Sequence, residues 1–387
     1  MGPAGRRRIN LMIRDQVYQR TLRHLFQPVA DLLFERADIT EILINGHDRV
    51  YCERAGRLEL TGRGFPSARA LEIAVRNLAE YVGRRLDENN HSMDARLPPP
   101  DAFRVHAIIP PCSRGGICLS IRKFGKKNEA TLDWVVKKGS LSPMAAEYLG
   151  LMVQTHRNIV VSGGTGSGKT SLLNALSFTI PNHERIVVIE DSSELQLAQE
   201  HTVYLEARQQ GPDGKGSVSI RDLFVDSLRM RPDRIIVGEV RRGEALDLVQ
   251  SMLSGHDGSL STVHASSPLL ALVRLETLCL MSDVVLPVYV ARMQVAQAMH
   301  VIAQISRMPD GSRRVVEISE GDGLGPGERY RLRPIFKQVN REDGATDLAW
   351  TGKKSRFADN ILQAVPAERR ELTTPLWQKK AADKVGQ

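Results

Sequence analysis

The residues from Gly163 to Thr170 have the types and the spacing of a phosphate-binding loop. They fit the pattern G-x-x-x-x-G-K-[ST], with an apolar run, 159–161, before them and a helix-like segment, 171–177, after them. Backbone N–H groups of such a turn can surround phosphate oxygens, and the following helix adds the positive end of its dipole. Because the flanks also match the strand–loop–helix context of the motif, a chance glycine-rich turn is the weaker interpretation.

Each part of this loop has an expected role in binding ATP and Mg²⁺, the two cofactors that the motif implies. Lys169 would reach the β- and γ-phosphates and take part in catalysis, and Thr170 would hold Mg²⁺. The residues of the loop expected to contact the nucleotide are Gly163, Gly164, Thr165, Gly166, Ser167, Gly168, Lys169, Thr170 and Ser171.

Two glutamates end apolar runs that read as neighbouring strands, Glu190 after 187–189 and Glu239 after 235–237. In parallel sheets functional residues gather at the carboxyl ends of the strands. An ATPase needs one carboxylate to orient the attacking water and another for the Mg²⁺ shell, so we predict Glu190 for the water and Glu239 for a water-mediated metal contact. The alternative for either glutamate is a structural cap on a helix N-terminus, and the nearby Asp191 and Glu194 could orient the loop.

The same strands argue against two other classes of nucleotide-binding protein. Asp233 stands at the start of its strand and should point away from the nucleotide, and this position disfavours helicases, which carry a D-E-x-x box at the strand end. The chain lacks an N-K-x-D motif for reading guanine, which favours ATP over GTP.

His264 follows the predicted strand 259–263 and is expected at the same edge of the sheet, whereas His256 precedes that strand and should lie further away. A neutral imidazole can both donate and accept, so His264 could contact the γ-phosphate or the water-orienting glutamate. A lone histidine is more often an ordinary packed or surface residue, and that alternative stays open.

Arginines are the remaining candidates, because a guanidinium suits the spread charge of a transferring phosphoryl group and can act from a neighbouring subunit. Any one of them could equally be a plain surface charge. The candidates for nucleotide contact are Arg122, Arg208, Arg221 and Arg231.

The composition limits the classes of partner. The 387 residues carry a formal net charge of +8, which would suit nucleic acid or an anionic membrane, but the basic residues are spread along the chain and we expect no specific nucleic acid. The four cysteines form no C-x-x-C pair, so no zinc site or disulfide framework is indicated. No apolar stretch is long enough to span a membrane, and the basic N-terminus lacks the apolar run of a signal peptide, so a cytoplasmic protein is expected.

The hydrophobic pattern predicts an α/β protein of two domains. Strands at 39–44, 49–54, 57–60, 105–109 and 117–121 with a helix at 67–82 indicate a small mixed domain with an antiparallel sheet. Strands at 158–162, 185–189, 202–205, 234–237 and 259–263 alternate with helices, which indicates a mostly parallel sheet. We predict a basic N-terminal arm (1–37), the first domain (38–128), a linker (129–142), the second domain (143–340) and a loosely packed charged appendage (341–387).

Three strings make the sequence resemble a known family. They run from Ile189 to Leu195, from Met230 to Arg241, and from Gly255 to Ala265, and together with the phosphate loop they are similar to type II/IV secretion-system ATPases. Within that family the chain looks most like the ATPases of tight-adherence pili, and the similarity covers about residues 38 to 340. The loop 208–216 with the segment 218–221 also matches the pilus branch.

The resemblance implies a PAS-like N-terminal domain, a RecA-like ATPase domain and a homo-hexameric ring. It further implies that nucleotide binds between the two domains, that arginines of the first domain or of a neighbour complete the site, and that the protein associates peripherally with the inner membrane through a platform protein. Hydrolysis would then drive pilus assembly or secretion. Two other hypotheses stay open: a nucleic-acid translocase or conjugative-transfer ATPase on the same core, and a scaffold that binds nucleotide without hydrolysing it.

Overall fold

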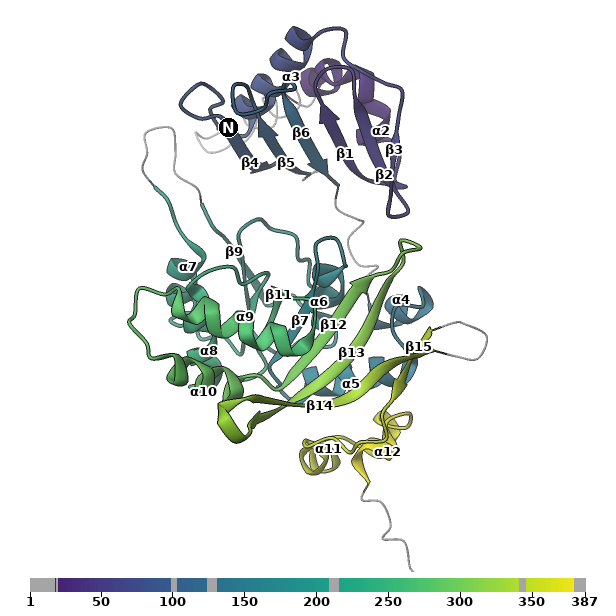
Figure 1. The fold of residues 1–387 in the computed structure, drawn as a ribbon, viewed down its shortest axis with the longest axis vertical. Coiled ribbons are helices and arrows are strands. Elements are labelled where there is room, and N and C mark those ends of the chain that lie inside the picture. The colour runs from purple at the N-terminus through teal and green to yellow at the C-terminus, as the bar shows by residue number, and fades with distance from the viewer. Residues whose placement is uncertain are drawn as a thin grey trace, which may run out of the picture. The chain divides into compact units, whose positions relative to one another are not determined.

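The protein is described here by a computed structural model that covers residues 18, 20–98, 103–123, 131–208, 216–340 and 346–378. The chain divides into two compact units (Figure 1). Unit 1 comprises residues 1–126 with 210–216, and unit 2 comprises residues 127–209 with 217–387.

Unit 1 contains a six-stranded antiparallel sheet in the order β3-β2-β1-β6-β5-β4. Its helix α3 begins where the Ser67 side chain accepts a hydrogen bond from the Ala70 N–H, a normal helix cap. The antiparallel mixed α/β unit predicted from the sequence is present, and its likeness to a PAS domain stays a prediction. The elements are α2 (Ala30–Phe34), β1 (Ile39–Asn45), β2 (Val50–Arg54), β3 (Arg57–Leu60), α3 (Ala68–Tyr81), β4 (Ser92–Arg96), β5 (Arg104–Ile108) and β6 (Cys118–Arg122).

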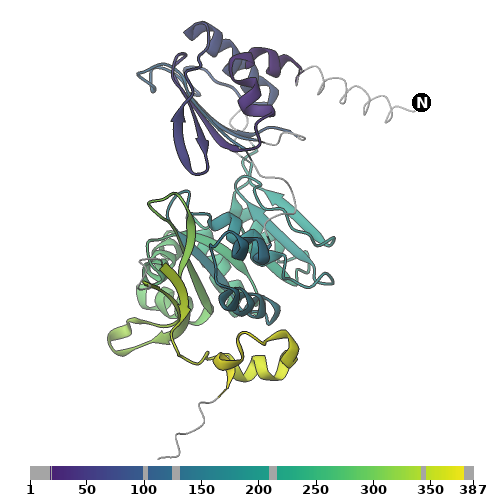
Figure 2. The same ribbon diagram turned by 90° about the vertical axis from the view of Figure 1, so that its right-hand side faces the viewer.

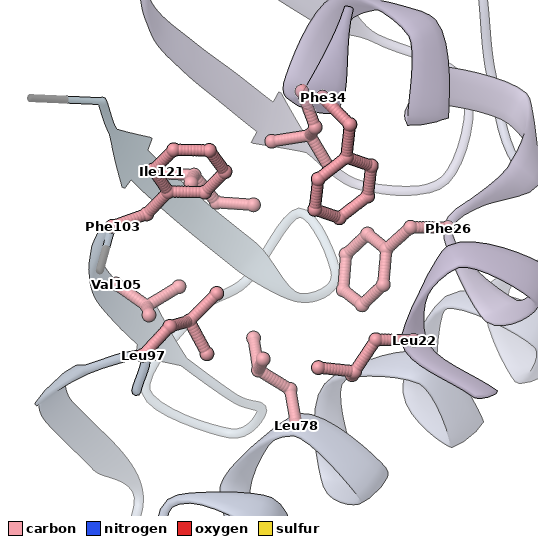
Figure 3. A pocket seen from close by; sticks show the side chains of 9 residues that line it. Leu22, Phe26, Phe34, Leu78, Leu97, Phe103, Val105 and Ile121 are labelled. Atoms are coloured by element: carbon pink, nitrogen blue, oxygen red, sulfur yellow. The ribbon is translucent and has the colours of Figure 1, made fainter. Parts of the chain in front are cut away.

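The core of unit 1 also takes in residues that the sequence assigned to a separate N-terminal arm. Five apolar side chains before residue 38 are buried against the sheet and α3, namely Leu22, Phe26, Val29, Leu32 and Leu33. Figure 3 shows two of these, Leu22 and Phe26, pointing into a small pocket beside Leu78 and Val105. Because all nine lining side chains are apolar, this pocket is a gap in the core with no group that could bind a phosphate.

Unit 2 is built on a nine-stranded sheet in the order β15-β14-β13-β12-β7-β11-β10-β8-β9. The pairings from β12 to β9 are parallel, and those from β12 to β15 are antiparallel, so the predicted mostly parallel sheet is confirmed. The strands are β7 (Ile159–Gly163), β8 (Ile186–Glu190), β9 (Thr202–Glu206), β10 (Arg234–Val237), β11 (Leu260–His264), β12 (Val301–Arg307), β13 (Arg313–Leu324), β14 (Tyr330–Asn340) and β15 (Thr346–Trp350).

Helices cover both faces of this sheet (Figure 1 and Figure 2). Along β7, Ile159 and Val161 face one core with α4, α5 and α6, whereas Val160 faces a second core with α7 to α10. A strand buried on both faces is mostly apolar, which is why residues 159–161 of β7 and 186–189 of β8 are unbroken apolar runs. The helices are α4 (Leu132–Lys137), α5 (Pro143–Gln154), α6 (Lys169–Ser177), α7 (Ile220–Ser227), α8 (Glu244–Leu253), α9 (Pro268–Leu280), α10 (Val288–Ala298), α11 (Ala358–Ala364) and α12 (Thr374–Trp377).

The segment expected to be a linker, 129–142, contains helix α4 instead. Thr131 caps this helix by accepting a hydrogen bond from the Trp134 N–H, and Leu132 and Val135 are buried against α5 and α6. The helix is only six residues long, too short for a helical period to stand out in a polar stretch.

The predicted loose appendage, 341–387, is also part of the fold over its described residues. β15 pairs with β14, and the side chains of Ile361, Leu376 and Trp377 are fully buried in the core of unit 2. Each short element contributes only one or two buried side chains, so the segment shows little periodicity although it is well anchored. Residues 341–345 and 379–387 lie outside the described residues.

Two carboxylates hold this C-terminal segment to the sheet. Glu320 on β13 is buried and accepts hydrogen bonds from Tyr148 Oη (2.8 Å), Arg356 N (2.8 Å) and Ser355 Oγ. Burial raises the pKa of the Glu320 carboxyl, and the three donors oppose that shift. Glu147 on α5 accepts from Thr373 N at 2.9 Å. Residues 355–373 are thus tied to unit 2 by specific polar contacts as well as by burial.

Candidate functional site

The glycine-rich loop lies between β7 and α6, in the strand–loop–helix context that the motif requires. Gly166 and Gly168 have φ angles of +67° and +96°, the left-handed region that favours glycine. At Gly163 a Cβ atom would collide with the carbonyl oxygen of Ile305 on the neighbouring strand β12. The glycines at these three positions are therefore required by the backbone path and by the close approach of β12.

Polar side chains of the loop fold back onto its own backbone. Ser167 is buried and donates from Oγ to the Gly164 carbonyl at 2.8 Å, and Lys169 donates from Nζ to the same carbonyl at 3.1 Å. Thr170 is half-buried and Ser171 is exposed at the start of α6. The lysine ammonium is thus held against the loop, where it can neutralise a bound phosphate chain.

The strand order places three predicted residues at one edge of the sheet. β11 lies directly between β7 and β10, and β8 follows β10, all of them parallel. His264 is the register partner of Gly163, so it stands beside the first glycine of the loop. Glu190 is the last residue of β8. Glu239 comes after the end of β10, separated from it only by Gly238. The sequence thus predicted correctly that these side chains share the carboxyl edge.

Lys169, His264 and Glu239 form one contiguous cluster. The Lys169 Nζ lies 3.3 Å from both ring nitrogens of His264, and His264 Nε2 lies 2.6 Å from Glu239 Oε1. Burial lowers the pKa of His264, and the nearby cations Lys169, Arg241 and Arg274 add to that effect, whereas Glu239 opposes it. The imidazole is therefore held mainly neutral and can exchange hydrogen bonds with a phosphate or a carboxylate.

Arg241 joins the two acidic strand ends. Its Nε donates to Glu239 Oε2 at 2.6 Å, and one terminal nitrogen donates to Asp191 Oδ2 at 3.2 Å. One guanidinium thus orients the carboxylate predicted to serve the metal and an aspartate from the loop after β8. The sequence reasoning did not single out Arg241, although its place two residues after Glu239 is a usable signal.

Glu190 is buried and orders the loop that follows β8. Its Oε1 accepts hydrogen bonds from the backbone N–H groups of Glu194 (2.9 Å) and Leu195 (3.0 Å). Gly238 lies so close that a Cβ there would come within 2.9 Å of the Glu190 Cγ. Glu190 thus orients the loop, a role that the sequence suggests for Asp191 and Glu194. Its role in orienting water stays a prediction.

The four predicted arginines are not gathered at the loop within unit 2. Arg221 is engaged on α7 with Asp247 (3.1 Å) and Asp283 (2.5 Å). Arg231 is exposed and precedes β10, which puts it at the amino edge, opposite the loop. Arg208 is exposed and forms an isolated antiparallel β-bridge with Val218. Arg122 lies on β6 of unit 1.

Three other residues do lie at the loop and were missed. Arg313 donates from Nε to the Gly166 carbonyl at 3.0 Å, and Arg307 extends toward Gly166 from the end of β12. Gln304, buried on β12, accepts from Ser162 Oγ and donates to the Ala265 carbonyl at 3.2 Å, which ties β7 and β11 together. The mostly apolar segment 301–305 and the turn residues Pro309, Asp310 and Gly311 after it are the available sequence signal, because this part of the chain passes the carboxyl edge beside β7.

The residues present fit Mg²⁺ bound together with a nucleotide. Mg²⁺ is typically held by one or two carboxylates plus substrate phosphates, with water filling the other positions. Thr170 and Glu239 could supply such contacts, and Glu239 Oε1 is buried without a hydrogen bond of proper geometry to any described residue. Nowhere in the described ranges do three or more His, Cys, Asp or Glu side chains gather into a site that could hold a metal alone.

Comparison with known proteins identifies the family. Residues 24–349 match the model of the type II/IV secretion system proteins. The chain is 35% identical over 284 residues to a putative conjugal transfer protein of Mycobacterium tuberculosis, Rv3659c, covering 72% of this chain and 80% of that protein. It is 31% identical over 318 residues to the conjugal transfer protein TrbB of Rhizobium radiobacter, covering 79% and 92%. With the type IV secretion system protein PtlH of Bordetella pertussis it shares 34% identity over 315 residues, covering 75% and 92%.

Solved structures agree with the fold. The ATPase DotB of Legionella pneumophila matches with a TM-score of 0.52 at 16% identity, covering 94% of this chain and 87% of that one. The pilus retraction motor PilT matches with a TM-score of 0.50 at 17% identity, covering 90% and 85%. At these identities the likeness supports the RecA-like fold of unit 2 and not a particular activity. The family match, together with the loop and the strand-end cluster, leads to one conclusion: this chain belongs to the type II/IV secretion system protein family.

Proposed function

We propose that this chain hydrolyses ATP at the loop between β7 and α6 and that hydrolysis powers a secretion, conjugation or pilus machine. The observation that carries the proposal is the convergence of Lys169, His264 and Glu239 at the carboxyl ends of adjacent parallel strands. A phosphate loop alone indicates only binding. A carboxylate and a neutral imidazole beside it add groups that can act on the γ-phosphate and on water.

Each side chain has a separate task in this proposal. Lys169 neutralises negative charge on the β- and γ-phosphates, and Thr170 and Glu239 hold the Mg²⁺ shell. Mg²⁺, when bound, offsets the charge that develops on the phosphoryl oxygens. Glu190 orients the attacking water, and His264 donates or accepts a hydrogen bond at the γ-phosphate, which its lowered pKa supports.

The machine is proposed from the family and its relatives. Named relatives are conjugal transfer proteins and a type IV secretion protein, which supports a type IV secretion or conjugative motor. The finer proposal, suggested by the motif strings, is the pilus assembly motor of a tight-adherence system. In either case we propose a homo-hexamer on the cytoplasmic side of the inner membrane, bound to a platform protein. No helix of the described residues is long and apolar enough to cross a membrane.

Two measurements on the purified full chain test this proposal. Phosphate release with Mg²⁺ should be faster with ATP than with GTP, because no guanine-reading motif is present. Sedimentation with a non-hydrolysable ATP analogue should give a hexamer. A strictly monomeric protein would contradict the ring, and equal turnover of GTP would contradict the nucleotide assignment. For the partner, membranes incubated with the Glu190→Ala protein should yield a polytopic platform protein.

A nucleic-acid translocase is the second candidate, favoured by the net charge of +8. Binding through phosphate contacts weakens steeply as salt rises, because counterions are released. DNA that stimulates ATP turnover strongly at low salt and loses the effect at high salt would favour this candidate over a protein-secretion motor. Turnover unaffected by DNA at any salt concentration would exclude it.

A further inference from the structure

The hairpin formed by β12 and β13 runs alongside the phosphate loop. β12 pairs in parallel with β7, and Ile305 is the register partner of Gly163, so residues after Ile305 extend past the carboxyl edge beside the loop. The turn is closed by a hydrogen bond from Met308 N to the Ser312 carbonyl at 2.7 Å. β13 then returns from Arg313. The hairpin therefore approaches the loop from the side of β7 opposite to β11 and its His264.

Two arginines of this hairpin face each other at the loop. Arg307 and Arg313 are register partners across the antiparallel pair. Like charges directly opposite on neighbouring strands are destabilising, and an anion bound beside them would offset that repulsion. The Arg307 side chain is exposed, and its guanidinium makes no hydrogen bond or ion pair with any residue that the structure describes. Its guanidinium is thus available to a ligand.

The distances place both side chains at the loop. Arg313 Nε donates to the Gly166 carbonyl at 3.0 Å, and its Cδ lies 3.0 Å from where a Cβ of Gly168 would be. A terminal nitrogen of Arg307 lies 3.9 Å from the corresponding Cβ position of Gly166. Arg313 thus binds the loop through the Gly166 carbonyl, while Arg307 lies next to the same turn with its guanidinium exposed.

We propose that the β12–β13 hairpin is a second phosphate-binding element, in which Arg307 binds phosphate oxygens of the nucleotide held by the loop and Arg313 positions the loop through the Gly166 carbonyl. The inference rests on the proposed nucleotide site and adds to it positive charge from the same chain. A guanidinium binds phosphate oxygens with planar, paired N–H groups, and a bound polyphosphate would offset the repulsion between the two arginines.

Arg314 is a matched control in the same hairpin. It is the next residue along β13, and its guanidinium is used elsewhere: it donates to the Thr346 hydroxyl at 3.1 Å and lies 3.9 Å from Asp310. Replacing it removes the same charge from the same element without touching the loop. Thermal melting of every variant checks that the fold is retained.

The test measures equilibrium binding of a non-hydrolysable ATP analogue and of pyrophosphate alone, with Mg²⁺, to the full-length chain. Arg307→Gln should weaken both ligands by the same factor, about tenfold, equal to about 1.4 kcal/mol. Arg314→Gln should leave both affinities unchanged. An Arg307→Gln protein that binds pyrophosphate as the unmodified chain does would overturn the inference, even if its affinity for the ATP analogue fell.

Lysine substitutions separate the two roles. Arg307→Lys should restore most of the affinity, because it keeps the charge that contacts phosphate. Arg313→Lys should not, because it loses the Nε donor that holds the Gly166 carbonyl, and the defect should extend to kcat. The opposite pattern would contradict the assignment. If the unmodified chain binds no nucleotide, the proposed function itself fails. If it binds nucleotide and Arg307→Gln has no effect, only the hairpin inference fails.

Discussion

The two edges of the parallel sheet in unit 2 both carry charged side chains, but in different states. At the amino edge Arg234 is fully buried and Glu184 nearly so, and they are joined by two hydrogen bonds. His156 Nε2 lies 3.3 Å from the same glutamate, and Arg234 also donates to the Gly258 carbonyl at 3.3 Å. These buried charges are matched within the fold.

At the carboxyl edge the charged side chains are less completely paired within the fold. His264 is 43% exposed and contacts Glu239 and Lys169, and burial and neighbouring cations disfavour its charged form. Glu239 Oε1 is buried without a well-formed hydrogen bond among the described residues. Buried charges that pair within the fold hold it together, whereas charges gathered beside a glycine loop with unmet hydrogen-bonding capacity can serve a ligand. The pairing of a charged side chain within the fold therefore distinguishes structural from functional charges better than its residue type does.

The largest expected effect is at the carboxyl edge. Glu239→Gln should lower kcat for ATP hydrolysis roughly 10³-fold, because the neutral amide cannot serve Mg²⁺ or a proton in the same way. Nucleotide binding, measured by fluorescence titration, should persist. The matched control is Asp233→Asn, which changes a carboxylate at the amino edge next to β10, where Asp233 accepts from Arg185 N at 2.7 Å. An equal loss of kcat in both variants would remove the distinction between the edges.

Substitutions at the amino edge should lower the stability of the fold and leave turnover nearly unchanged. Arg234→Met leaves the buried Glu184 without its partner and should lower the free energy of unfolding by about 3–5 kcal/mol, measured by denaturant titration. The double variant Arg234→Met/Glu184→Leu removes both charges and should recover much of that loss. Turnover per folded molecule should stay close to that of the unmodified chain. A selective loss of turnover with unchanged stability would reverse the roles of the two edges.

Low pH should lower the free energy of unfolding through His300, a residue of the amino edge that directly precedes β12. Its Nδ1 accepts a hydrogen bond from Asn158 N at 3.0 Å, and burial, helped by Arg356 and Arg157 and opposed by Asp257, lowers its pKa to about 4. In the unfolded chain the imidazole of His300 binds a proton near pH 6.5. The folded state therefore keeps its full stability above that pH. As pH falls toward 4, the free energy of unfolding should decrease by up to about 3 kcal/mol.

His300→Gln should flatten this pH dependence of the unfolding free energy between pH 6.5 and 4. The control His183→Gln changes an exposed histidine of the same unit and should leave the profile as it is. Identical profiles for His300→Gln and the unmodified chain would show that the buried imidazole is not the group that titrates.

The smallest effect concerns Arg241, which orients Glu239 and Asp191. Arg241→Gln should lower kcat about tenfold, or about 1.4 kcal/mol, since the carboxylates stay in place but lose their common partner. The neighbouring Arg242 has an exposed side chain that makes no hydrogen bond or ion pair with any described residue, so Arg242→Gln serves as the control. Equal kcat in the two variants would mean that the arginine bridge does not position Glu239.

The sequence predicted the parallel core and its chemistry well because both leave local marks. The buried strands β7 and β8 begin with continuous apolar runs, and Gly163, Glu190 and His264 are the last residues of β7, β8 and β11. Once the strands are ordered in a sheet, these ends meet at one edge without further information.

What the sequence did not predict depends on contacts between distant segments. The hairpin arginines Arg307 and Arg313 follow no motif, and their place at the loop arises only because β12 pairs with β7. The C-terminal segment is anchored by isolated side chains such as Trp377, with no periodic pattern. Arg221 resembled a phosphate ligand by type, but its guanidinium is engaged with Asp247 and Asp283, which no local pattern reveals.

The most direct test of ATP hydrolysis at the carboxyl edge compares phosphate release from ATP by the full-length chain and by its Lys169→Ala variant, with and without Mg²⁺. We expect Mg²⁺-dependent release by the unmodified chain and none above background by Lys169→Ala. Both proteins should have similar melting temperatures, because Lys169 lies at the loop and not within either apolar core. Normal release by a folded Lys169→Ala protein would contradict the assignment of the carboxyl edge as the site of hydrolysis.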